Sequence, residues 1–71
     1  MSNEKSIEVF FANGVFEEYK NKTIEEFNRF TSNLYFAKKE NEFYKYEYQD
    51  GSGRDVISYI NPDNVLYVRY R

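Results

Sequence analysis

The chain has 71 residues, with 10 Lys and Arg against 12 Asp and Glu, a net charge of −2, and neither Cys nor His. A chain of this length can hold only one small domain, because it buries only about 60% of its unfolded surface. The missing Cys and His exclude disulfide bonds, thiolate nucleophiles, imidazole catalysis and the usual zinc sites, and the slight acidity lacks the basic excess typical of nucleic-acid-binding proteins.

The first predicted element is a β-hairpin. Residues 6–12 alternate between polar and apolar side chains, and Asn13-Gly14 follows them. Alternation predicts a strand, and Asn-Gly is a strong hairpin signal, so we expect a second strand over residues 15–20.

Two registers of this hairpin compete. A two-residue loop pairs Phe11 with Phe16, whereas a three-residue loop with a left-handed glycine pairs Phe11 with Val15. The second register gathers more apolar side chains on one face. It also sets Glu8 opposite Glu18, which disfavours it modestly, so both registers remain open.

A helix is expected next, because Thr23 and Glu26 form a capping box, in which each side chain accepts a hydrogen bond from the other residue's amide. Asn33 suits the left-handed position that ends a helix, so we expect about three turns. The apolar residues recur at helical spacing and predict one stripe that faces a sheet: Ile24, Phe27, Phe30 and Leu34.

Strand candidates follow the helix at residues 34–39, 42–49 and 54–60, with turns at residues 40–41 and 50–53. Residues 61–64 place a proline at the second position of a type I turn, and residues 65–71 alternate as a last strand. The predicted fold class is α+β, in the order ββαβββ, which has one strand fewer than the candidate segments. We expect an antiparallel sheet packed on one helix, with a small five-stranded barrel carrying one helix as the alternative.

The predicted core is small for a chain that has no disulfide bonds, so we expect a marginally stable monomer. Association buries further apolar surface, and a homodimer or a complex with another protein is therefore expected. The side chains assigned to this core are Ile7, Val9, Phe11, Ile24, Phe27, Phe30, Leu34, Phe36, Ile57, Leu66 and Val68.

Composition also bears on compartment and origin. No apolar run approaches the roughly 18 residues of a membrane helix, and residues 1–5 lack the order of a signal peptide, which predicts a cytoplasmic protein without membrane contact. With 7 Phe and 8 Tyr the chain is too aromatic to stay disordered. We expect one domain over residues 1–71, with residues 1–5 loose. The abundance of Asn, Lys, Tyr and Ile is typical of AT-rich coding sequences, as in low-GC bacteria and their mobile elements. Residues 58–68, a strand, an Asn-Pro-Asp-Asn turn and a strand, resemble the closing hairpin of small proteins from Gram-positive bacteria, phages and plasmids.

Alternating tyrosines make the most distinctive pattern in the chain. Tyr44, Tyr46 and Tyr48 share one face of a strand, because side chains alternate along it. One interpretation is a docking platform, since tyrosine offers a large and rigid contact area. The other is a half-buried sheet face, which the frequency of tyrosine in strands favours.

The last strand repeats this theme. Alternation places Val65, Tyr67, Arg69 and Arg71 on one face, and this strand can recruit a partner strand only if it lies at a sheet edge. The predicted partner-binding residues are therefore Tyr44, Tyr46, Tyr48, Tyr67, Arg69 and Arg71.

These patterns favour a non-enzymatic module that binds another protein or itself. The first alternative is a domain that stacks single-stranded nucleic acid on its tyrosines, and the second is a small inhibitor of a host nucleic-acid enzyme. Glu25 and Glu26 are explained by their favourable interaction with the start of the helix. Together with Glu17 and Glu18 they form a cluster in the sequence, but this cluster contains no nucleophile–base pair. We therefore expect no catalytic residue, no metal ligand and no cofactor.

Overall fold

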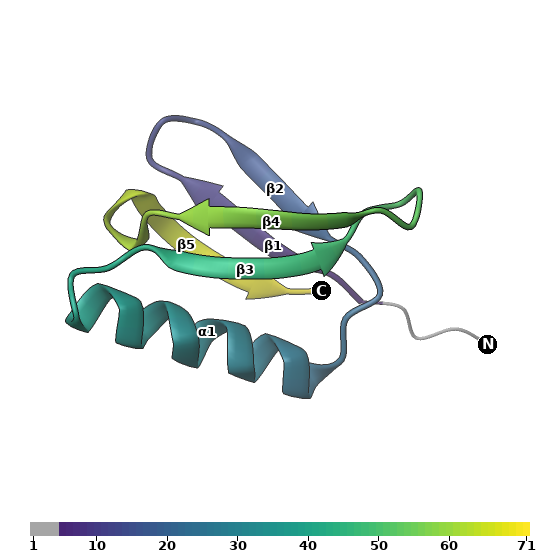
Figure 1. Cartoon of the computed structure of the whole chain (residues 1–71), viewed down its shortest axis with the longest axis horizontal. Helices are drawn as coiled ribbons and strands as arrows, with labels where there is room; N and C mark the ends of the chain where they lie inside the picture. Colours follow the sequence, from purple (N-terminus) through teal and green to yellow (C-terminus); the bar gives the residue numbers. More distant parts are fainter. Residues whose placement is uncertain (1–4) are drawn as a thin grey trace.

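The computed structural model describes residues 5–71, which form five strands and one helix (Figure 1). A three-stranded antiparallel sheet has the strand order β2-β1-β5, and a two-stranded sheet contains β3 and β4. The predicted α+β class and the order ββαβββ are confirmed. The strands form two sheets instead of one, and they do not close into the alternative barrel. The elements are β1 (Ile7–Phe11), β2 (Phe16–Tyr19), α1 (Ile24–Lys39), β3 (Tyr44–Gln49), β4 (Asp55–Ile60), a 3-10 turn (Pro62–Asn64) and β5 (Val65–Tyr70).

The two sheets lie across each other, and α1 runs along one side of the pair, next to β3 and β5 (Figure 1). This helix closes the gap between the sheets on that side. Residues 1–4, part of the segment expected to be loose, lie outside the described residues. Lys5 is held by a hydrogen bond that the Lys22 amide donates to its carbonyl (2.9 Å).

The first hairpin adopts the three-residue loop. The Phe11 amide donates to the Val15 carbonyl (2.9 Å), and Gly14 has a φ of 88°, which favours glycine. Glu8 therefore does lie opposite Glu18. The repulsion is offset because Glu8 also pairs with Arg69 on the neighbouring strand β5.

The second hairpin repeats the same turn. The Asp50 amide donates to the Arg54 carbonyl (3.0 Å), and Gly53 has a φ of 84°. The Asp50 carboxylate accepts hydrogen bonds from the Ser52 hydroxyl (2.7 Å) and from the amides of Ser52 and Arg54, and these bonds lower its pKa. Both β-hairpins are thus set by short-range hydrogen bonds and one left-handed glycine each.

Helix α1 begins as predicted and ends later. Both halves of the Thr23–Glu26 capping box are present, with donor–acceptor distances of 2.8 and 3.1 Å. The helix continues to Lys39, so the interpretations of Asn33 as its end and of residues 34–39 as a strand are wrong. Ala37 extends the half-buried stripe one turn beyond the predicted end, and the left-handed residue is Asn41, with a φ of 61°.

The core lies between the two sheets and α1. Of the predicted core residues, Ile24, Phe36, Ile57 and Leu66 are exposed, so their assignment is wrong. Phe36 lies off the helix stripe, because residues 34–39 are helical and not extended. Tyr19 and Ile60 were missed. The most deeply buried apolar residues are Ile7, Val9, Tyr19, Phe30 and Ile60.

Within residues 5–71, no helix is long and apolar enough to cross a membrane.

Candidate functional site

The predicted tyrosines of β3 face the core. The Tyr46 ring lies 4.8 Å from the rings of both Tyr19 and Phe30, centroid to centroid. Tyr48 lies 4.7 Å from Tyr19, and Tyr44 lies 5.3 Å from Phe30. These positions match the half-buried sheet face, one of the two interpretations of the pattern. That the three tyrosines bind a partner stays a prediction.

Burial changes the acidity of these phenols. It raises the pKa of Tyr46 to about 12, and it also raises the pKa of Tyr44. The pKa of Tyr19 is also raised, mainly by burial and to a lesser extent by the nearby Glu17 carboxylate. All three hydroxyls are therefore neutral at physiological pH, as a packed core requires.

The last strand carries a bulge that changes its faces. The pairing of β1 with β5 shifts between Phe10 and Phe11, so Val65 packs against the core while Tyr67 and Arg69 point outward. The prediction that Val65 shares a face with Tyr67 is therefore wrong, because alternation fails across a bulge. Leu66 lies at the same irregularity and is exposed.

Strand β5 lies at an edge of its sheet, the condition set for strand recruitment. That edge is on the side of α1, however. The Tyr70 ring stacks on Phe27 with centroids 5.2 Å apart, and the Tyr70 hydroxyl donates to the Lys22 carbonyl (2.6 Å). The helix and its preceding loop therefore restrict access to this edge.

The outward face of the three-stranded sheet carries a row of aromatic rings. Phe10 on β1 lies between Phe16 on β2 and Tyr67 on β5, with centroid distances of 4.7 and 4.5 Å. Phe16 and Tyr67 are 46% and 50% exposed. We call Phe10, Phe16 and Tyr67 the aromatic ladder. Sequence reasoning missed Phe10 and Phe16, although two adjacent phenylalanines in one strand, as at 10 and 11, must point to opposite faces.

A fixed ion pair adjoins the ladder. The Arg69 Nε donates to the Glu8 Oε1 at 2.5 Å, and the guanidinium carbon of Arg69 lies 5.0 Å from the centre of the Phe10 ring. The hydrogen bond to Glu8 raises the pKa of Arg69. This guanidinium is therefore held in one place at the border of the ladder.

The charges on this face balance. Glu18 lies opposite the outward-facing Glu8. Arg71 continues the pairing of β5 with the chain before β1 through two backbone hydrogen bonds with Ser6 (2.8 and 3.0 Å). Two carboxylates and two guanidiniums thus accompany the rings. The predicted residues Tyr67, Arg69 and Arg71 come together here, whereas the β3 tyrosines lie on the inner side of the other sheet.

No family model, curated protein sequence or solved structure matches this chain.

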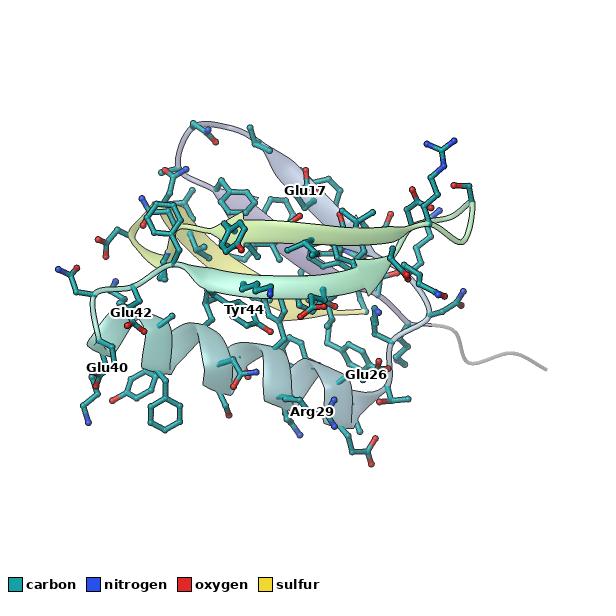
Figure 2. The ribbon with its side chains drawn as sticks, in the orientation of Figure 1. Glu17, Glu26, Arg29, Glu40, Glu42 and Tyr44 are labelled. Atoms are coloured by element: carbon teal, nitrogen blue, oxygen red, sulfur yellow. The ribbon has the colours of Figure 1, made fainter. Side chains whose placement is uncertain are left out.

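The carboxylates do not gather into a site. The Glu26 carboxylate is engaged in the capping box, which lowers its pKa through the hydrogen bond from the Thr23 amide. Figure 2 shows Glu17 beside β2 and Glu26 at the start of α1, well apart. Across residues 5–71, no three acidic side chains are grouped so that they could hold a metal ion.

Proposed function

We propose that this protein is a non-enzymatic protein-binding module that contacts its partner through the aromatic ladder and Arg69. The observation that carries the proposal is the row of three touching rings, whose outer members are about half exposed. Clustered aromatic side chains and arginine dominate the binding energy of protein interfaces, and soluble monomers rarely leave large apolar patches uncovered.

Charge and ring geometry favour a protein over single-stranded nucleic acid. Binding to phosphates needs a net positive surface, whereas Glu8 and Glu18 offset Arg69 and Arg71 on this face. Bases also stack on free ring faces. Phe10 is already in contact with two groups, because Tyr67 stacks on it at an interplanar angle of 20° and Arg69 lies over it.

A comparative capture experiment tests the proposal. The wild-type protein and the variants Phe16→Ser, Tyr67→Ser and Tyr35→Ser are immobilised and exposed to an extract of cells that express it. Tyr35 is the control, because it is an aromatic residue on α1 that is even more exposed (64%) and lies outside the ladder. We expect one protein to be retained by the wild type and by Tyr35→Ser, and to be lost from both ladder variants. Retention should persist from about 0.1 to about 1 M salt, because an apolar interface is little affected by screening.

Two outcomes would contradict this proposal. Equal retention by all four baits would exclude the ladder as the binding surface. Recovery of nucleic acid that is lost at high salt would favour the single-strand-binding alternative, which fluorescence anisotropy with a labelled oligothymidine would then measure directly. If the retained protein is a nucleic-acid enzyme whose activity falls in the complex, the module acts as the inhibitor considered above.

A further inference from the structure

The outer edge of β4 lacks the devices that natural edge strands use against pairing. Strand β4 is an edge of the two-stranded sheet, and its pairing with β3 contains no bulge. Asp55, the first residue of the strand, is its one charged residue, and the strand has no proline. Ile57 and Tyr59 point outward from the sheet and are 54% and 65% exposed. Such an edge is a template for another strand.

The phase of the hairpin shows which backbone groups are free. The hydrogen bond from the Asp50 amide to the Arg54 carbonyl makes residues 50 and 54 a hydrogen-bonded pair. Hydrogen-bonded and non-bonded pairs alternate in antiparallel strands, so β4 bonds to β3 through Val56, Ser58 and Ile60. The amides and carbonyls of Asp55, Ile57 and Tyr59 therefore point toward the open edge.

Space is available beside this edge. A groove of about 320 Å³ lies between β4 and the hairpin that contains β2. Both strands lie on the side of the molecule opposite α1 (Figure 1). Ser58 and Ile60 line the groove from one sheet, and Val15, Glu17 and Tyr19 line it from the other. One side of the paired sheets is thus closed by the helix, while the other is open along β4.

We propose that a second copy of this chain pairs with β4, antiparallel and about a two-fold axis at Ile57, to form a four-stranded sheet β3-β4-β4-β3. This register sets Ile57 opposite Ile57 of the partner subunit and Asp55 opposite Tyr59 of the partner subunit. All three residues with free backbone groups then form hydrogen-bonded pairs, each exchanging two bonds. Moving the axis to residue 56 or 58 leaves Tyr59 or Asp55 without such a pair.

The side chains suit this arrangement on both faces. No like charges meet across the seam, because Asp55 faces a tyrosine whose neighbour on β3 is Lys45. The two Ile57 side chains cover each other on the outer face. On the inner face, Val56 of the partner subunit comes over the groove beside Tyr19, so the dimer covers apolar surface that the small monomer core does not.

Cysteine cross-linking tests the register, because the natural chain has no cysteine. Hydrogen-bonded partners have Cα atoms about 5.5 Å apart, within reach of a disulfide. Ile57→Cys is therefore expected to give a covalent dimer on oxidation. Tyr59→Cys is the matched control on the same strand and face, and it should stay monomeric on a non-reducing gel. An equimolar mixture of Asp55→Cys and Tyr59→Cys should cross-link.

Light scattering tests the assembly itself. We expect the wild type to have twice the chain mass of 8.6 kDa, and Ile57→Lys to have the chain mass with an unchanged circular dichroism spectrum. Phe16→Ser should remain dimeric, which separates this inference from the proposed ladder function. The inference is overturned if the wild type is a monomer at about 1 mM, or if Tyr59→Cys cross-links as readily as Ile57→Cys.

Discussion

Replacing Phe30 by alanine is expected to remove a large part of the protein's stability. The Phe30 side chain is 1% exposed, and its ring lies 4.8 Å from Tyr46, 5.3 Å from Tyr44 and 6.0 Å from Tyr19. Truncating a fully buried phenylalanine costs about 3–5 kcal/mol. A domain of this length has a free energy of unfolding of roughly 4–11 kcal/mol, so the variant should be close to unfolding in water.

Urea unfolding followed by far-UV circular dichroism measures this loss. With a slope of about 1.5 kcal/mol per molar urea, the midpoint should fall by about 2–3 M. Phe36→Ala is the control, because Phe36 lies on the same helix but is 57% exposed. Its replacement should change the free energy of unfolding by less than about 0.5 kcal/mol.

The two variants together examine how α1 is oriented. If Phe36→Ala lowered the midpoint as much as Phe30→Ala, the stripe that faces the sheets would be misplaced. Residues 34–39 would then fit the strand predicted from sequence, in which Phe36 belongs to the core.

Three further measurements probe separate contacts. Gly14 has a φ of 88° and Gly51 lies outside the left-handed region, so Gly14→Ala should cost about 1 kcal/mol in urea unfolding, whereas Gly51→Ala should cost nothing. The lowered pKa of Glu26 gives stability that is present above its ordinary pKa of about 4.3 and is lost as the pH falls through the folded-state value. Glu26→Gln should therefore reduce the loss of unfolding free energy measured between about pH 6 and pH 2. Burial raises the pKa of Tyr46 to about 12. The neutral phenol therefore contributes fully to the free energy of unfolding below about pH 10, and this contribution is lost as the pH rises. Tyr46→Phe should reduce the loss of unfolding free energy measured between about pH 9 and pH 11.

The start of the helix could be predicted from sequence, and its end could not. The capping box at Thr23 is a local pattern with one structural meaning. Two asparagines, Asn33 and Asn41, could each take the left-handed position that ends a helix. The aromatic residues after Asn33 favoured a strand and therefore the earlier end. Two signals pointed to the later end, namely Ala37 on the apolar stripe and the lysines at 38 and 39, which stabilise a helix C-terminus.

The faces of the strands were predictable only where alternation is unbroken. It placed the β3 tyrosines together correctly, and it failed at Val65, where a bulge turns the side chain inward. Which face of β3 is exposed to solvent depends on the position of the helix and of the other sheet. No pattern within β3 contains that information.

The aromatic ladder itself depends on strand order. Phe10 and Tyr67 become neighbours because β1 pairs with β5, and these strands lie at opposite ends of the sequence. Local periodicity predicts strands and their faces, but it does not say which strands are adjacent. The candidate site was therefore found from sequence only in its β5 half.

The pairing of β1 with β5 also bears on how the protein is made. Glu8 and Arg69 are 61 residues apart, so on the ribosome the first strand emerges long before the strand that completes its sheet. The two β-hairpins and the helix depend on short-range contacts and can form while synthesis continues. Until β5 arrives, one edge of β1 stays unpaired and the Phe10 ring stays uncovered. A nascent chain that stalls before β5 would expose both to other proteins, so the interval between the synthesis of β1 and that of β5 carries an aggregation risk.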